Sequence, residues 1–78
     1  MDTLSDVDPG DTFQIVTIPD DRIRAQLQRM GFLDGAVECR QQLRKGPVII
    51  RRHGTQMAIG ASVARAVEVA FGRDLDHD

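Results

Sequence analysis

The chain lacks tryptophan and tyrosine and has a single cysteine among its 78 residues. Cys39 alone cannot form an internal disulfide, and the acidic N-terminus has no apolar leader, so we expect a cytoplasmic protein. The three phenylalanines are scattered, which leaves no aromatic platform for stacking nucleic-acid bases. No apolar run is long enough to cross a bilayer. These absences favour a soluble protein that does not bind nucleic acid.

The length of the chain limits its architecture. We expect one domain with a thin core over residues 1–73, followed by a disordered acidic tail over residues 74–78. A deep catalytic pocket does not fit so small a domain, which favours a binding or interaction module. Neither Ser5 nor Ser62 has a histidine in a catalytic arrangement, and no phosphate-binding glycine motif is present. We therefore predict that the protein is not an enzyme.

The net charge of −2 conceals a segregation of charge along the chain. Residues 1–21 contain six aspartates and no cation, whereas residues 22–73 carry all ten Lys and Arg against three acidic residues. These charges either coat a solvated surface or, around one predicted hairpin, form a basic face for an acidic partner, a phosphate or a membrane-proximal surface. The cations around that hairpin are Arg44, Lys45, Arg51 and Arg52.

Residues 12–18 are rich in β-branched side chains and predict the first strand. In a regular strand Val16 and Ile18 would face away from Phe13 and Ile15. All four are apolar, so one face cannot account for them. We therefore expect a β-bulge, or a strand shared between two sides of a small barrel.

A helix of about three turns is predicted after this strand. Asp20 or Asp21 can cap its N-terminus, because a carboxylate accepts hydrogen bonds from the unpaired N–H groups of the first turn. The helix should end at Met30, since Gly31 readily adopts the positive φ of a helix C-terminus. Asp34 and Gly35 then form a turn that tolerates left-handed backbone.

The remainder of the chain predicts four more strands. In residues 37–43 the side chains of Val37, Cys39, Gln41 and Leu43 alternate toward one face, which places Cys39 in the core. Five short strands with one helix and one helical turn predict a small β-barrel, for which an SH3-like barrel fits best and an OB-type barrel second. The later elements are a connection at Arg44-Lys45-Gly46-Pro47, a strand over 48–53, a turn at Gly54-Thr55, a strand over 56–59 ended by Gly60, a helical turn capped by Ser62, and a strand over 67–71.

Three segments that span nearly the whole chain carry a family resemblance. They read PGDTFQIV, RAQLQRMGFLDGAVECRQQ and GPVIIRRHGTQMAIGASVARAVEV. In this order they resemble the FeoA family, the small cytoplasmic proteins of bacterial ferrous iron uptake. The sequence departs from the family at Phe32-Leu33-Asp34, where leucine followed by proline is more frequent, and in the acidic tail. The matching positions are Met30-Gly31-Phe32, Gly35, Val37, Gly46-Pro47, Ala58-Ile59-Gly60, Ala64, Val67 and Val69.

The resemblance implies a non-enzymatic accessory protein that acts on FeoB, a membrane transporter whose cytoplasmic G domain hydrolyses GTP. Two consecutive apolar residues, Phe32 and Leu33, lie in the helix-to-strand connection, where they either pack on the core edge or contact a partner. Together with Arg44, Lys45, Arg51 and Arg52 they form the predicted partner-binding set, an apolar anchor surrounded by charge.

Two alternative functions and one assembly remain open. The basic hairpin could belong to a nucleic-acid-binding small barrel, although the acidic balance of the chain weakens this reading. The same barrel also resembles the C-terminal SH3-like domain of metal-dependent repressors, but no helix-turn-helix precedes it here. Exposed edges in so small a barrel also make a homodimer an option.

Metal binding is not expected. The weak candidate ligands are Cys39, His53 and His77, and no pair of them has the spacing of a known metal motif. Cys39 is predicted to be a buried hydrophobe, His53 a solvated loop residue beside a glycine, and His77 part of the tail. We therefore predict no structural metal and no cofactor.

Overall fold

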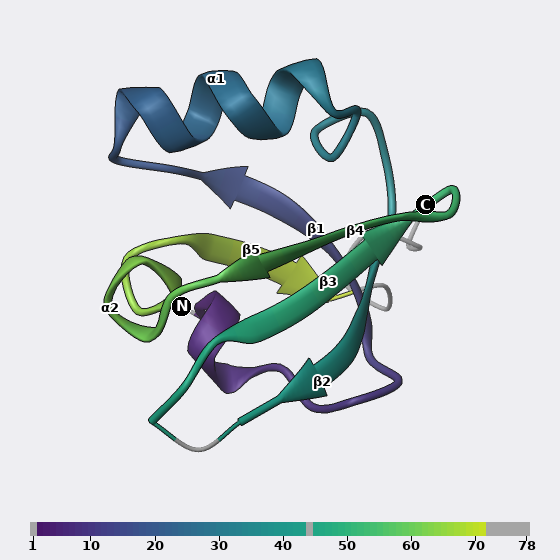
Figure 1. Ribbon diagram of the computed structural model, residues 1–78, viewed down its shortest axis with the longest axis vertical. Coiled ribbons are helices and arrows are strands. Elements are labelled where there is room, and N and C mark those ends of the chain that lie inside the picture. The colour runs from purple at the N-terminus through teal and green to yellow at the C-terminus, as the bar shows by residue number, and fades with distance from the viewer. Residues whose placement is uncertain (1, 44, 72–78) are drawn as a thin grey trace.

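A five-stranded antiparallel sheet curls into a small SH3-like barrel in the computed structural model, which describes residues 2–43 and 45–71. The predicted fold class is confirmed. A helix, α1, lies along one side of the strands, and a short helical turn, α2, precedes the last strand (Figure 1). The elements are η1 (Leu4–Asp6), β1 (Thr12–Thr17), α1 (Asp21–Arg29), β2 (Val37–Gln42), β3 (Val48–Arg52), β4 (Thr55–Ile59), α2 (Ala61–Ala64) and β5 (Glu68–Phe71).

The strands follow the order β4-β3-β2-β1-β5, so the two edge strands are β4 and β5. The outer edge of β5 is covered by the N-terminal segment. The Leu4 N–H donates to the Val67 carbonyl at 2.8 Å, and the Val69 N–H donates to the Asp2 carbonyl at 3.0 Å. No helix among the described residues is long and apolar enough to cross a membrane.

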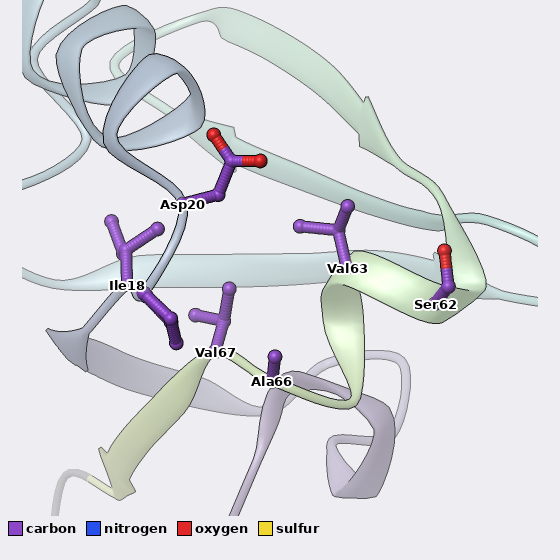
Figure 2. A pocket seen from close by; sticks show the side chains of 7 residues that line it. Ile18, Asp20, Ser62, Val63, Ala66 and Val67 are labelled. Carbon is purple, nitrogen blue, oxygen red and sulfur yellow. The ribbon is translucent and has the colours of Figure 1, made fainter.

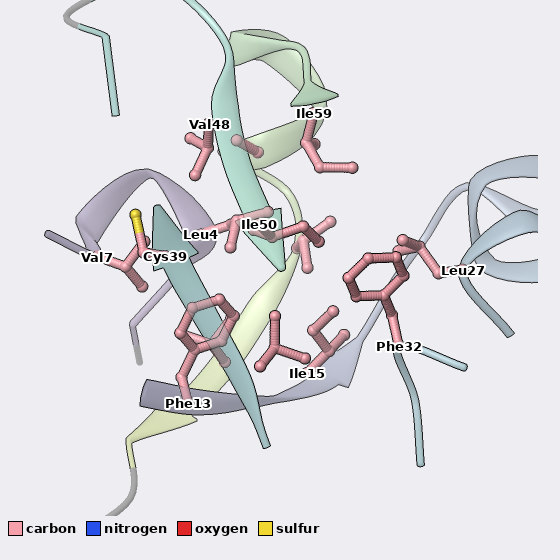
Figure 3. Close-up of a cluster of buried hydrophobic side chains, with 14 of the residues drawn as sticks. Leu4, Val7, Phe13, Ile15, Leu27, Phe32, Cys39, Val48, Ile50 and Ile59 are labelled. Atoms are coloured by element: carbon pink, nitrogen blue, oxygen red, sulfur yellow. The ribbon is translucent and has the colours of Figure 1, made fainter. Parts of the chain in front are cut away.

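The core is made of buried aliphatic and aromatic side chains that come from every strand and from both ends of the sheet (Figure 3). Its least expected contributors are Leu4 and Val7, which are fully buried. They belong to the 3-10 turn η1 and the residue after it, an element that the acidic, turn-rich sequence did not predict. The buried set is Leu4, Val7, Phe13, Ile15, Ile18, Leu27, Phe32, Val37, Cys39, Val48, Ile50, Ile59, Ala64, Val67 and Val69.

The predicted bulge in β1 is confirmed. The register against β5 shifts between Ile15 and Thr17, which leaves Val16 as the extra residue. Val16 is 53% exposed, while Ile18 beyond it is buried. The bulge thus returns the apolar residues on both sides of it to the core.

A second bulge, in β2, was not predicted. The register against β3 shifts between Cys39 and Gln41, so the alternation inferred from the sequence is wrong beyond Cys39. Gln41 and Leu43 are exposed, and Gln42 is turned inward instead. The Gln42 side-chain amide donates to the Ser5 carbonyl at 3.0 Å and also to the Val7 carbonyl. This side chain therefore ties η1 to the sheet.

The predicted boundaries of α1 are confirmed. The Asp20 carboxylate accepts hydrogen bonds from the backbone N–H groups of Arg22 and Ile23. Met30 is the C-terminal cap, and Gly31 follows with a φ of +83°. An apolar stripe with the fully buried Leu27 at its centre faces the sheet.

Gly35 does not have the left-handed backbone that the sequence predicted for it. What the structure shows at Gly35 is a close approach by a side chain and not a positive φ. A Cβ at this position would lie 2.8 Å from both Nη1 and Nη2 of Arg52. A side chain at this position would therefore displace the Arg52 guanidinium, which packs directly against the backbone.

The β3–β4 turn uses other residues than expected. The β3–β4 loop is His53-Gly54, with φ of +50° and +82°, rather than Gly54-Thr55. In the described part of the β2–β3 connection, Lys45 has a left-handed backbone, with a φ of +62°. Gly60 ends β4 as predicted.

The helical turn α2 is not capped by Ser62, contrary to the sequence prediction. The N-cap position is Gly60, which has no side chain to accept a hydrogen bond. Ser62 instead lies one residue inside the helix and is exposed.

Candidate docking surface

A shallow depression of about 260 Å³ lies between the β2–β3 connection and α2. Its floor is apolar, because Val48 and Ala64 are buried beneath it. Leu43 and Lys45 stand on one side and Arg65 on the other. Within the described residues, this is where an exposed large apolar side chain adjoins cations, and we call it the Leu43 surface.

The conformation of the β2–β3 connection exposes Leu43. The Leu43 carbonyl accepts the Gly46 N–H at 2.8 Å, and the Leu43 N–H donates to the Pro47 carbonyl at 3.2 Å. A Cβ on Gly46 would lie 3.0 Å from the Leu43 Cβ, so glycine allows the loop to close this tightly. Leu43 is left 45% exposed, and Val16 is the other large hydrophobic side chain that is exposed in the described chain.

Two cations flank this apolar side chain. Lys45 is exposed in the connection itself, and Arg65 is exposed at the C-terminal cap of α2. Neither forms an ion pair with another described residue. An apolar anchor between unpaired cations fits a partner segment that combines acidic and apolar side chains.

Phe32 belongs to the core and is a correction to the predicted partner-binding set. The left-handed Gly31 turns the chain so that the Phe32 N–H donates to the Leu27 carbonyl at 2.9 Å. The Phe32 ring then lies beside Leu27 with no exposed surface (Figure 3). Leu33 is half-buried and packs against the core. The helix-to-strand connection is therefore mainly architectural.

The predicted basic cluster is divided between the two ends of β3. Lys45 precedes the strand, whereas Arg51 and Arg52 lie at its far end, next to the His53 turn. Nε of Arg51 lies 3.8 Å from Oε1 of Glu38 on the neighbouring strand. Arg52 donates hydrogen bonds to backbone carbonyls of the α1–β2 connection. Arg44 lies outside the described residues. The continuous basic face that a nucleic-acid-binding barrel would need is thus not formed by Lys45, Arg51 and Arg52.

The candidate metal ligands do not come together. Cys39 is free and fully buried, and this burial raises the pKa of its thiol. His53 is exposed in the β3–β4 turn, as expected, and His77 lies outside the described residues. Among the residues that the structure describes, no three His, Cys, Asp or Glu side chains could hold a metal ion.

A second depression, of about 190 Å³, separates the β1–α1 connection from α2 (Figure 2). Its lining is mainly apolar and includes Ile18, Val63 and Val67. Asp20 lies at its border, but its carboxylate already caps α1. The cap uses Oδ1 of Asp20, so Oδ2 of this carboxylate and the Ser62 hydroxyl are the polar groups at the depression.

Sequence reasoning found Lys45 but missed Leu43 and Arg65. Strict alternation predicts that the Leu43 side chain faces the core. The bulge in β2 turns this side chain outward instead. No sequence motif marks Arg65 as a site residue, because only the fold brings α2 beside the β2–β3 connection. The pair Gln41-Gln42 is a sequence signal for the bulge. In a regular strand consecutive side chains point to opposite faces, so one of the two amides has to face the core.

The fold defines a small SH3-like barrel, and the Leu43 surface lies on it between the β2–β3 connection and α2. The FeoA domain model matches residues 3–70, and the chain belongs to this family. A crystal structure of an iron uptake regulatory protein, FeoA, is 33% identical; the match covers 88% of this chain and 93% of that one, with a TM-score of 0.72.

A second solved structure shows the same fold at lower identity. The NMR structure of a FeoA-like protein from Clostridium acetobutylicum is 19% identical, with a TM-score of 0.67, and the match covers 97% of this chain and 90% of that one. No curated protein matches the chain. The predicted family is thus confirmed.

Proposed function

We propose that this protein is a cytoplasmic, non-enzymatic accessory protein of ferrous iron uptake, which acts by binding the cytoplasmic part of a GTP-dependent membrane transporter of the FeoB type. Membership of the FeoA family supports the connection to iron uptake, and the related crystal structure is named an iron uptake regulatory protein. The observation that carries the interaction is the Leu43 surface. There, an exposed leucine adjoins an apolar floor and two cations that form no ion pair with the described residues.

The chemistry of this surface defines what the transporter must present. Leu43 gains most by inserting into an apolar pocket of the partner, because central apolar contacts shielded from water contribute most of the binding energy. Lys45 and Arg65 would then face carboxylates at the rim. Rim charges of this kind mainly accelerate association and make it dependent on salt.

The test is isothermal titration calorimetry of the full chain with the cytoplasmic domain of its transporter. We expect Leu43→Asp to weaken binding by about 30-fold or more, the effect of losing an interface hot spot. Lys45→Glu should weaken it less and reduce its dependence on salt. Both side chains are exposed, so the thermal midpoint of each variant should stay close to that of the wild type.

Val16→Asp is the matched control. Val16 is as exposed as Leu43 and receives the same charge, but it lies in the bulge of β1, outside the Leu43 surface. It should bind like the wild type. Absence of binding by the wild type, or equal losses for Leu43→Asp and Val16→Asp, would contradict the proposal.

A further inference from the structure

The two edges of the sheet differ in how they are protected. Hydrogen bonds from the N-terminal segment cover the outer edge of β5. At β4 no described residue forms a backbone hydrogen bond to the outer side of Gln56 or Ala58. Both residues are exposed. Within the described chain, β4 is therefore the strand with an open edge.

The β3–β4 turn determines which groups of β4 point outward. His53-Gly54 is a two-residue loop with positive φ at both positions, so Arg52 and Thr55 form the hydrogen-bonded pair that closes the hairpin. Hydrogen-bonded pairs alternate with non-bonded pairs along an antiparallel ladder. Gln56 and Ala58 hence occupy non-bonded positions against β3, and their N–H and carbonyl groups face the open edge.

The features that commonly protect an edge strand are absent from β4. The strand reads TQMAI, without a charged residue or proline, and its register against β3 is continuous over all five residues. The two arginines of β3 next to it are engaged elsewhere, Arg51 near Glu38 and Arg52 with backbone carbonyls. The edge strand thus has no charged residue of its own, either to attract a charged strand or to repel a copy of itself.

We propose that the edge of β4 pairs with β4 of a second copy, antiparallel and about a two-fold axis at Met57. In this register Gln56 of each copy lies opposite Ala58 of the other. Because these residues carry the outward-facing groups, each pair exchanges both hydrogen bonds of a ladder. The two Met57 side chains meet at the axis on the core side, where Met57 is already half-buried. The sheets of the two copies become continuous.

One strand pair buries less surface than a standard interface, so the dimer is weak, with a Kd on the order of 100 μM. Sedimentation velocity of the full chain from about 10 μM to about 1 mM should show a sedimentation coefficient that rises with concentration. Ala58→Lys should remain monomeric over this range because it places two charges at the dimer edge. The matched control is Ala25→Lys, an exposed alanine of α1, which should dimerise like the wild type.

Two further measurements locate the interface. Ala58→Pro removes an N–H that β3 does not use, so it should abolish the dimer while the chain stays folded. In NMR spectra of the wild type, concentration-dependent amide shifts should centre on residues 55–59. A chain that stays monomeric at 1 mM, an Ala58→Lys variant that dimerises normally, or shifts centred on another element would each overturn the inference. None of these outcomes depends on the transporter, so they are separate from the test of the proposed function.

Discussion

Arg52 of β3 donates a hydrogen bond from Nε to the carbonyl oxygen of Gly31, 2.9 Å away and 21 residues earlier in the chain. Its Nη1 donates to the Ala36 carbonyl at 2.8 Å, so one guanidinium spans the connection between α1 and β2. The positive charge also lies where the α1 dipole is negative. Gly35 lies beneath this guanidinium and leaves it the space it needs.

Gly35→Ala should therefore destabilise the protein through Arg52. The new Cβ would displace the guanidinium, and the carbonyls of Gly31 and Ala36 would lose a charged donor. We expect the free energy of unfolding to fall by about 1–2 kcal/mol. Urea denaturation measures this change. Gly60→Ala is the control, because no atom lies within 4 Å of a Cβ there and its φ is −59°; it should change stability by less than about 0.5 kcal/mol.

A double-mutant cycle separates this mechanism from backbone strain. In an Arg52→Met background the guanidinium is already absent, so Gly35→Ala should lower the free energy of unfolding only slightly further. Full additivity of the two substitutions would show that Gly35 acts independently of Arg52, contrary to the structure.

Gln42→Ala should destabilise the protein while Gln41→Ala should not. Gln42 is half-buried and its amide bonds the carbonyls of Ser5 and Val7, whereas Gln41 beside it is exposed. Loss of the Gln42 amide leaves the part-buried Val7 carbonyl without this donor, at a cost of about 1–3 kcal/mol. Urea denaturation measures the loss of stability, and amide hydrogen exchange near Leu4 measures the loosening of η1. Similar stability of the two variants would mean that the bulge in β2 is absent in solution.

This pair of glutamines shows what the sequence could and could not predict. Local patterns predict the strands, α1 with its cap, the turn at Gly31 and the bulge at Val16. They do so because turn chemistry and apolar periodicity depend on neighbouring residues. The bulge in β2, between Cys39 and Gln41, accompanies a contact of Gln42 with Val7, which lies 35 residues earlier in the chain. No local pattern records such a contact.

The candidate site was predicted less well than the fold for the same reason. Phe32 looked available because consecutive apolar residues in a connection suggest a surface, but the turn at Gly31 returns its ring to the core. Lys45 was identified from charge alone. Its neighbours Leu43 and Arg65 come from segments that only the closed barrel brings together.

Phe32→Ala separates the core role from a role in binding. Truncation of a fully buried phenylalanine should lower the free energy of unfolding by about 3–5 kcal/mol. Chemical denaturation measures this loss. Under conditions where the variant is still folded, its affinity for the transporter domain should match that of the wild type. An unchanged stability combined with lost binding would restore Phe32 to the interface.

The absence of a metal site stays a prediction that dialysis can test. His53 stands alone in an exposed turn, and Cys39 is enclosed in the core. Equilibrium dialysis against Fe²⁺ under anaerobic conditions should reveal no stoichiometric site with a Kd below about 10 μM. His53→Ala should give the same result as the wild type. A tight stoichiometric site in the full chain would overturn the prediction.

Cys39 should make stability fall at high pH. Burial, assisted by the nearby carboxylates of Asp11, Asp8 and Glu38, raises the pKa of the folded thiol above its ordinary value of 9.0. The folded state therefore holds this proton more tightly than the unfolded state. The corresponding stability is complete below pH 9.0 and is lost as pH rises toward the folded pKa, by at most about 1.4 kcal/mol per pH unit. Urea denaturation at about pH 8 and at about pH 10 measures this loss of stability. Cys39→Val, which replaces the thiol by a side chain of similar size, should not show it. Equal pH dependence of the two proteins would show that the thiol does not titrate differently on folding.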